Sequence, residues 1–243
     1  MKIALYGYGK MGKAIEQAAL KRGHEVVLRV NQANAGTPPT GADVAIEFSR
    51  PATAEENMRL CLAHGVPVVV GTTGWYDRLP LIQAEVERTG GSLLWASNFS
   101  IGVQLFFRLN RQLAEWMSGQ PGYAASMEET HHIHKLDAPS GTAITLAEGV
   151  AAGHPGYAGW KLVEGTDKAD DGAAPRPVPI TSHRIGEVPG THTIQWASPE
   201  DRITITHEAF GRQGFAVGAV VAAEWLRGRK GLYTMADVLG PAA

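Results

Sequence analysis

The stretch ETHHIHKLDAPSGTA, residues 129–143, gathers residue types that could do chemistry: His131, His132, His134 and Lys135 stand within five positions. A histidine titrates near neutral pH and can give or take a proton, and a lysine is a fixed positive charge that can also donate one. This combination predicts a site that captures an anionic substrate and exchanges protons with it.

The PSGT segment that follows is typical of a turn into a helix. Pro139 would rigidify the entry and Ser140 would cap the helix, so that Gly141 and Thr142 present backbone N–H groups at its N-terminus. Such a helix end binds carboxylates. A small substrate with a carboxylate at each end would suit the histidines and lysine on one side and this helix end on the other.

Two other interpretations of these residues compete. A metal site would use His131 or His132 with His134 and Asp137, but the Lys135 ammonium would repel the ion and the spacing matches no common zinc pattern. We therefore predict no metal. Alternatively, the histidines could simply be hydrogen-bonded along a strand with the lysine solvated, although three histidines beside a lysine make this interpretation less favoured.

A second motif stands near the beginning of the chain. GYGKMG, residues 7–12, is a G-x-G-x-x-G pattern placed directly after an apolar run and at the start of a helix-like segment. Gly7 would permit the tight turn, Gly9 would let a pyrophosphate approach the backbone, and Gly12 would let the helix pack closely on the strand. The pattern indicates a dinucleotide site at a helix N-terminus.

The residues expected at the adenosine ribose leave the cofactor open. An NAD site usually has an acidic residue at the end of the second strand, but here LRVNQAN offers Arg29 and Asn31. Arg29 could be an ordinary surface arginine, or it could pair with a 2′-phosphate, which would let NADPH bind at least as well as NADH. We predict NADPH and/or NADH as cofactor. Two further strand ends, GTT at 71–73 and ASNFS at 96–100, fall where ligands bind in parallel sheets.

The elements that must position these residues follow two patterns. Up to about residue 98, strand-like and helix-like segments alternate, including a helix after Thr53 with a Thr53–Glu56 capping box. Beyond it we expect helices at 101–117 and 141–152, a long loop at 153–180 and a hairpin around SPED. The expected fold is α/β: a Rossmann-like parallel-sheet nucleotide domain, and an α+β substrate-binding and oligomerisation domain with a mostly antiparallel sheet.

Composition excludes several classes of partner. The 243 residues carry a formal net charge of −2 and 19% charged residues, which gives no electrostatic reason to expect nucleic acid or an anionic membrane surface. Cys61 is the only cysteine, so no intramolecular disulfide can form. There is no long apolar run and no signal-peptide pattern at the start. The expected location is therefore the cytoplasm.

Taken together, these motifs resemble the 4-hydroxy-tetrahydrodipicolinate reductase family, also called dihydrodipicolinate reductase, over nearly the full length. The resemblance rests on GYGKMG, IEFSRPA (46–52), VVVGTTGW (68–75), ASNFSIGV (96–103), EETHHIHKLDAPSGTA (128–143), SHRIGEVPGTH (182–192) and HEAFGRQGFAVGAV (207–220).

The resemblance implies a dinucleotide-binding domain of residues 1–97 and 212–243, a substrate-binding and oligomerisation domain of residues 98–211, and a homotetramer. It implies hydride transfer from a nicotinamide to a cyclic dicarboxylate with loss of water. His131 would be the acid/base and Lys135 the proton donor, and the substrate would bind His132, Ser140, Gly141 and Thr142. The implied cofactor contacts are Gly7, Tyr8, Gly9, Lys10, Met11, Gly12, Gly71, Thr72, Thr73, Ala96, Ser97, Asn98, Phe99 and Arg212, together with Arg29 and Asn31.

Two other functions stay open on sequence grounds. The same scaffold could serve a nicotinamide oxidoreductase for an amino acid such as aspartate, but the HHIHK and PSGT string argues against it. The chain could also be a nucleotide-binding regulatory module. His131 beside Lys135 speaks against that function, because a sensor needs no proton donor next to its anion site.

Overall fold

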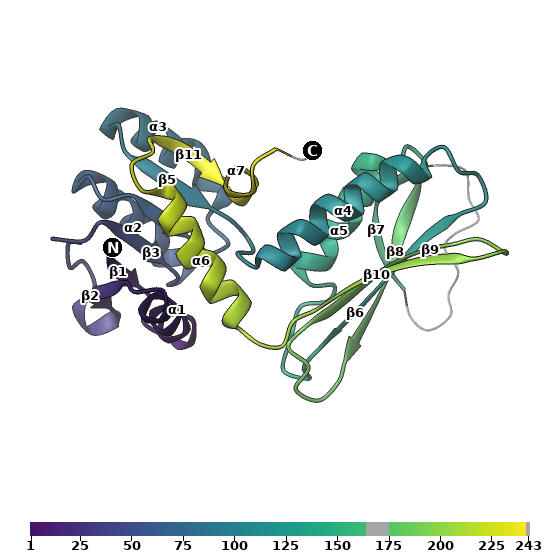
Figure 1. Cartoon of the computed structure of the whole chain (residues 1–243), viewed down its shortest axis with the longest axis horizontal. Helices are drawn as coiled ribbons and strands as arrows, with labels where there is room; N and C mark the ends of the chain where they lie inside the picture. Colours follow the sequence, from purple (N-terminus) through teal and green to yellow (C-terminus); the bar gives the residue numbers. More distant parts are fainter. Residues whose placement is uncertain (164–174, 242–243) are drawn as a thin grey trace. The chain divides into compact units, whose positions relative to one another are not determined.

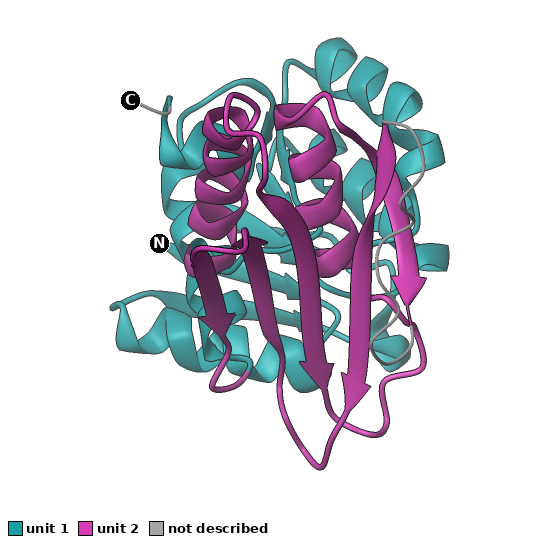
Figure 2. Ribbon diagram, turned by 90° about the vertical axis from the view of Figure 1, so that its right-hand side faces the viewer, with its two compact units in different colours: residues 1–101, 212–243 teal, residues 102–211 magenta. Residues whose placement is uncertain are grey.

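The computed structural model describes residues 1–163 and 175–241. The chain divides into two compact units, one of residues 1–101 and 212–243 and the other of residues 102–211 (Figure 2). The first unit is therefore built from both ends of the chain. Among the described residues, no helix is long and apolar enough to cross a membrane.

Unit 1 contains a six-stranded sheet in which every strand pair is parallel, in the order β11-β5-β4-β3-β1-β2 (Figure 1). Its strands are β1 (Lys2–Tyr6), β2 (Glu25–Val30), β3 (Val44–Glu47), β4 (Val68–Val70), β5 (Ser92–Trp95) and β11 (Gly231–Thr234). Its helices are α1 (Lys10–Lys21), α2 (Pro51–Ala63), α3 (Leu79–Thr89), α6 (Gln213–Leu226) and α7 (Met235–Leu239), with short 3₁₀ turns η1 (Gln32–Asn34) and η2 (Tyr76–Arg78).

Helices cover both faces of this sheet, as the alternation of strands and helices predicts. Successive residues of a strand point to opposite faces, so the strands are apolar on both sides. One core joins β1, β3 and β4 to α1 and α6, and includes Leu5, Ile15 and Val220. The other joins the same strands to α2 and α3, and includes Met58 and Ile82.

Two local predictions for unit 1 need correction. Helix α2 begins at Pro51 and not after Thr53, because proline is accepted in the first helical turn, where its missing N–H has no partner to lose. The Thr53 hydroxyl donates to the Arg50 carbonyl within that turn instead of capping the helix. Strand β11 was not expected at all, since GLYT is too short to stand out; its pairing with β5 places the C-terminal segment in this sheet.

Unit 2 contains a five-stranded mixed sheet in the order β10-β9-β6-β8-β7. Pairs β10–β9 and β9–β6 are antiparallel, whereas β6–β8 and β8–β7 are parallel. The elements are α4 (Ile101–Met117), β6 (Ala124–His131), α5 (Gly141–Gly153), β7 (Tyr157–Val163), β8 (Arg176–Arg184), β9 (Thr191–Ala197) and β10 (Arg202–Glu208). The expected hairpin at SPED is the β9–β10 connection.

Helices α4 and α5 pack on one face of this sheet, where Leu113 and Leu146 meet Met127, Ile194 and the other apolar residues of the strands. The predicted loop at 153–180 is wrong for its described part, which contains β7 and the first half of β8. The glycines and prolines around YAGWKLV obscured a strand. Residues 164–174 of that prediction lie outside the described residues.

Candidate active site

The glycine loop joins β1 to α1, and Gly9 is the residue that caps the helix. Gly7 has φ +94°, and a Cβ there would lie 2.2 Å from the Phe48 carbonyl oxygen. A Cβ on Gly12 would lie 2.4 Å from the Gly7 carbonyl oxygen, whereas one on Gly9 would meet nothing within 4 Å. Gly7 and Gly12 are therefore required by the fold itself. Gly9 borders open space, where a ligand can approach the backbone.

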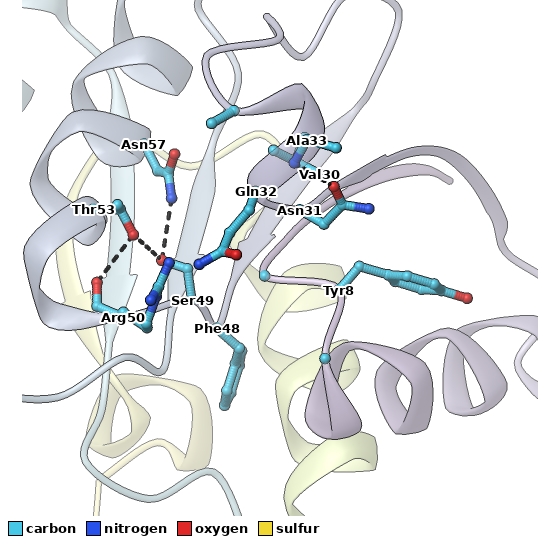
Figure 3. A pocket seen from close by; sticks show the side chains of 13 residues that line it. Tyr8, Val30, Asn31, Gln32, Ala33, Phe48, Ser49, Arg50, Thr53 and Asn57 are labelled. Carbon is cyan, nitrogen blue, oxygen red and sulfur yellow. Dashed lines mark hydrogen bonds between the residues drawn. The ribbon is translucent and has the colours of Figure 1, made fainter.

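That space is a cavity of about 640 Å³ beside the glycine loop (Figure 3). Three segments line it: the glycine loop, the end of β2 with the turn that follows, and the β3–α2 connection. Arg50 brings a positive charge, and no carboxylate is present among the described residues of the lining. The lining residues are Gly7, Tyr8, Gly9, Val30, Asn31, Gln32, Ala33, Ala35, Phe48, Ser49, Arg50, Thr53 and Asn57.

Arg29 is not among these residues, and its contact with the cofactor stays a prediction. Its Nε donates to Glu16 Oε1 at 2.9 Å, and its Nη2 contacts the same oxygen. The guanidinium holds the pKa of Glu16 below its usual range and also lies 5.9 Å from the centroid of the Tyr8 ring. Asn31 does line the cavity, but its side-chain oxygen accepts from the Ala33 N–H.

Arg50 and Gln32 both line this cavity. With the Gln32 amide turned so that its oxygen faces Arg50, that oxygen accepts from the guanidinium, with Nη1 at 3.1 Å. Figure 3 shows both side chains extending into the cavity. The signal in the sequence was the IEFSRPA motif, which contains Arg50 but was used only for the family resemblance.

The other predicted cofactor segments follow neighbouring strands of the same sheet. Residues 71–73 follow β4 and residues 96–99 follow β5. Because all these strands are parallel, both segments lie at the carboxyl-terminal end of the sheet, as the glycine loop does. Within them Thr72 is buried and Thr73 exposed, while Phe99 is a core residue whose ring lies 5.6 Å from that of Phe48. Arg212 is exposed immediately before α6.

In unit 2 strand β6 ends at His131, so His132 and His134 belong to the loop that leads to α5. Lys135 Nζ lies 2.8 Å from both carboxylate oxygens of Asp137. Burial opposes ionisation of Asp137, but the Lys135 ammonium holds its pKa below the usual range. The lysine is thus already arranged to bind a carboxylate.

Ser140 is the N-cap of α5, as predicted, and its hydroxyl accepts from the Ala143 N–H at 3.2 Å. Its own N–H donates to both oxygens of Glu129 at 3.1 Å. The helix N-terminus therefore lies directly beside the end of β6, and Gly141 there is exposed.

A row of polar side chains crosses the sheet beneath this loop. Strand register pairs Glu129 of β6 with His192 of β9 and with Ser182 of β8. The preceding row on the same face is the apolar set Ile194, Met127 and Ile180. The buried face of the sheet therefore changes from apolar to polar at the level where α5 begins.

Glu129 is almost fully buried and ionised. Burial would raise its pKa, but the polar side chains of His131, His192, Ser140 and Ser182 around the carboxylate hold that pKa well below its usual range. Arg184 Nη2 lies 3.2 Å from its Oε1 and also donates to the Asp137 carbonyl.

Sequence reasoning assigned no role to Glu129, Ser182, Arg184 or His192. The signal was the alternation of β6, which puts Glu129 on the same face as His131. The partner strands lie in the quoted SHRIGEVPGTH motif.

The geometry nearest to a metal site among the described residues is Glu129, His131 and His192, whose ligand atoms lie within 4.8 Å of one another. The Arg184 guanidinium already neutralises this carboxylate, so the cluster needs no cation to balance its charge. The absence of a metal stays a prediction.

The parallel sheet, the glycine loop and the cavity beside it place unit 1 in the class of Rossmann-like dehydrogenase folds. The whole chain matches two family models, "Dihydrodipicolinate reductase, N-terminus" over residues 1–99 and "Dihydrodipicolinate reductase, C-terminus" over residues 102–239. The chain belongs to the dihydrodipicolinate reductase family.

Individual relatives agree with this assignment. A 4-hydroxy-tetrahydrodipicolinate reductase of Christiangramia forsetii is 45% identical over 241 residues, covering 98% of each chain. A protein of the same name from Neisseria gonorrhoeae is 38% identical, covering 82% of this chain and 73% of its own. Among solved structures, a dipicolinate-bound dihydrodipicolinate reductase from Paenisporosarcina sp. TG-14 has a TM-score of 0.77 at 24% identity, covering 96% of this chain and 97% of its own.

Proposed function

We propose that this chain catalyses the NAD(P)H-dependent reduction of 4-hydroxy-tetrahydrodipicolinate to tetrahydrodipicolinate in diaminopimelate and lysine biosynthesis. The reaction adds a hydride and a proton to the cyclic dicarboxylate and releases water. The observation that carries the proposal is the 45% identity to a 4-hydroxy-tetrahydrodipicolinate reductase over almost the whole chain.

The residues of unit 1 fit a nicotinamide dinucleotide. The open space at Gly9, the N-terminus of α1 and the cationic lining of the cavity suit a pyrophosphate and an adenosine. When bound, the nicotinamide supplies the hydride. The protein orients the cofactor through the glycine loop and through the ends of β4 and β5, with Gly71–Thr73 and Ala96–Phe99 as the proposed contacts.

The residues of unit 2 fit a small dicarboxylate. We assign one substrate carboxylate to Lys135 and His132, and the other to the α5 N-terminus with the backbone of Gly141 and Thr142. A substrate carboxylate at Lys135 would take the place of Asp137, which now holds the ammonium at 2.8 Å. His131 serves as the acid/base and Lys135 as the proton donor. The relative solved with dipicolinate supports a dicarboxylate ligand.

Cofactor choice follows from the cavity. Arg50 can fork onto phosphate oxygens, and an acidic residue that would repel a 2′-phosphate is absent from the described lining residues. Both cofactors should therefore work, with NADPH bound at least as tightly as NADH. The arginine responsible is Arg50, since Arg29 is paired with Glu16.

The assembly we propose is a homotetramer formed through unit 2. Trp160 and Leu162 on the edge strand β7 and Ile203 on the opposite edge strand β10 are apolar side chains that are 39–41% exposed. We place this enzyme in the cytoplasm. Light scattering on the purified protein tests the assembly, and a monomer would contradict it.

The activity is tested by following loss of the reduced-nicotinamide absorbance with freshly generated 4-hydroxy-tetrahydrodipicolinate, and separately with oxaloacetate and ammonia. Oxidation with the first substrate alone is the expected result. Turnover with the second pair alone would instead identify an aspartate dehydrogenase. Tight nucleotide binding without turnover on either would identify a regulatory module.

A further inference from the structure

The nitrogen atoms of His131 have unequal surroundings. Its Nε2 points into the polar row: it lies 3.3 Å from His192 Nε2 and 3.5 Å from Glu129 Oε2. A Cβ on Gly190 would come within 2.8 Å of Cε1 and 3.2 Å of Nδ1, so the ring is packed against that glycine's backbone. Of the two ring nitrogens of His131, Nε2 is therefore the one that contacts the buried side chains of Glu129 and His192.

The hydrogen bonds around His192 decide which atom carries the proton. The Ser140 hydroxyl already accepts from the Ala143 N–H, so its own proton is available for His192 Nε2 at 3.1 Å. Burial lowers the pKa of His192, which favours the neutral ring, and we place the lone pair of that ring at Nε2, where it accepts the Ser140 proton. With His192 Nε2 and the Glu129 carboxylate both acting as acceptors, the donor between them must be His131 Nε2–H.

We propose that Glu129 is a positioning residue that, with His192 and Ser140, fixes the tautomer of His131: Nε2 keeps its proton and Nδ1 is the nitrogen that exchanges protons in turnover. The second half of this inference rests on the proposed function, whereas the tautomer itself does not. Glu129 also accepts a hydrogen bond from the Ser140 N–H. Its partner Arg184 donates to the backbone carbonyls of Lys135 and Asp137, so these groups are held close to the same carboxylate. One buried carboxylate thus aligns the acid/base, the helix N-terminus and the lysine loop.

The charged and titratable groups around His131 come from four strands and the loop after β6. Glu129 lies on β6 itself, Arg184 on β8 and His192 on β9. His207 on β10 pairs in register with His192, and the Lys135 charge from the loop also lowers the pKa of His192. Of these, Glu129 alone carries a negative charge beside the His131 ring.

The direct test is ¹⁵N NMR of the wild-type protein with labelled histidine, without substrate or cofactor. The His131 signals are identified by their loss in His131→Gln. We expect the Nε2–H tautomer in the neutral ring. An Nδ1–H tautomer would overturn the proposal, and this result does not depend on whether any variant folds or whether the enzyme turns over the proposed substrate.

The variant Glu129→Gln tests the role in turnover. Its amide nitrogen can donate toward His131 Nε2, which favours the wrong tautomer; amide replacement of an orienting carboxylate lowers kcat by up to about 10⁴-fold in serine hydrolases. We expect a kcat loss of about 10²–10⁴-fold with unchanged cofactor affinity, and a pH profile of kcat that differs from that of the wild type. Glu129→Asp, which keeps the charge, should restore part of the rate.

Glu128→Gln is the matched control, because Glu128 is the exposed neighbour on the other face of β6. It should leave kcat and the pH profile unchanged. A folded Glu129→Gln protein with the wild-type tautomer and wild-type pH profile would overturn the positioning role, whatever its stability. If the wild type shows the expected tautomer but no reduction of the substrate, the proposed function fails and the tautomer assignment stands.

Discussion

The two units each bury a glutamate at the carboxyl end of a strand, and they treat its charge in opposite ways. Glu47, at the end of β3, accepts from the Ser49 N–H and the Asn57 amide, and its Oε2 has no hydrogen-bond partner among the described residues. Burial therefore raises its pKa. Glu129, at the end of β6, has an arginine, two histidines and two serines around it, and its pKa is well below the usual range.

The difference matches the charge that each site must receive. Ser49 and Asn57 line the cavity of unit 1, so Glu47 lies directly behind a site for a negatively charged nucleotide. A carboxyl that tends to be neutral there causes little repulsion. In unit 2 the groups that we propose to face an anionic substrate are cations or proton donors, and the negative charge of Glu129 lies behind them. The same residue type thus serves opposite electrostatic needs.

The largest effect should follow loss of the lysine that receives the substrate. Lys135→Ala removes both the positive charge and the proton donor, so kcat should fall by at least the 10²–10⁴-fold typical of general acid catalysis, with cofactor affinity near normal. Lys161→Ala, an exposed lysine on β7, is the control and should be neutral. Steady-state kinetics measure kcat, and nucleotide titration measures the cofactor affinity. A Lys135→Ala enzyme with wild-type kcat would remove the lysine from the mechanism.

Loss of the acid/base should have a somewhat smaller effect. His131→Ala leaves Lys135 and the helix N-terminus to bind and polarise the substrate, so kcat should fall by about 10²–10³-fold. Cofactor binding in unit 1 should not change. Because His131 belongs to the buried polar row, thermal unfolding must first show that the variant is folded. A folded variant with near wild-type kcat would contradict the acid/base role.

The glycine loop offers a test within unit 1 that separates function from folding. Gly9→Val places a side chain in open space, so the variant should fold normally but lose nucleotide binding, by at least about 10²-fold in Kd if the pyrophosphate is displaced. Gly12→Val meets the Gly7 carbonyl at 2.4 Å and should unfold the unit. Fluorescence titration with NADH gives the answer. Unchanged affinity in folded Gly9→Val would mean that the loop is only structural.

The two arginines near the cavity give a sharper test of cofactor choice. Arg50→Ala should weaken NADPH by about 1–3 kcal/mol, the range for a lost charge-assisted hydrogen bond, and leave NADH almost unchanged. Arg29→Ala is its matched control: it breaks the pair with Glu16 and should not discriminate between the cofactors. Isothermal titration with both nucleotides measures the difference. If Arg29→Ala, and not Arg50→Ala, selectively weakened NADPH binding, Arg29 would be the residue that contacts the 2′-phosphate.

The smallest effect concerns the pH dependence of stability. Because the folded pKa of Glu47 is raised, the unfolded chain releases this proton first, and stability falls as pH rises from about 4.3, the ordinary glutamate pKa, through the folded pKa. Glu47→Gln should remove this slope, so the variant gains stability relative to the wild type as pH rises. Urea unfolding at several pH values tests it. A slope that persists in the variant would belong to another group.

Much of this arrangement follows from local sequence. The alternation of apolar strands and helices is enough to predict unit 1, because a parallel sheet needs helices on both faces, and Ser140 shows itself as a cap by its place before a helical segment. The predictions that failed concern Pro51, where proline is locally ambiguous, the short strand GLYT, which is held by its neighbour, and strand β7, which glycines and prolines obscure.

The rest depends on contacts between segments that are distant in sequence. Nothing local reveals that Arg29 meets Glu16, because that pair depends on how α1 packs on β2. His192 and Glu129 are 63 positions apart and meet only through the register of β9 with β6. A one-residue slip of that register would turn His192 to the other face.

The most direct test of the central claim is to follow the hydride itself. NADPH deuterated at the transferring position is incubated with the protein and freshly generated 4-hydroxy-tetrahydrodipicolinate, and the products are analysed by mass spectrometry. We expect tetrahydrodipicolinate that carries the deuterium, formed by the wild type and by Lys161→Ala but not by Lys135→Ala. Folded wild-type protein that binds NADPH but transfers no deuterium to this substrate would contradict the account.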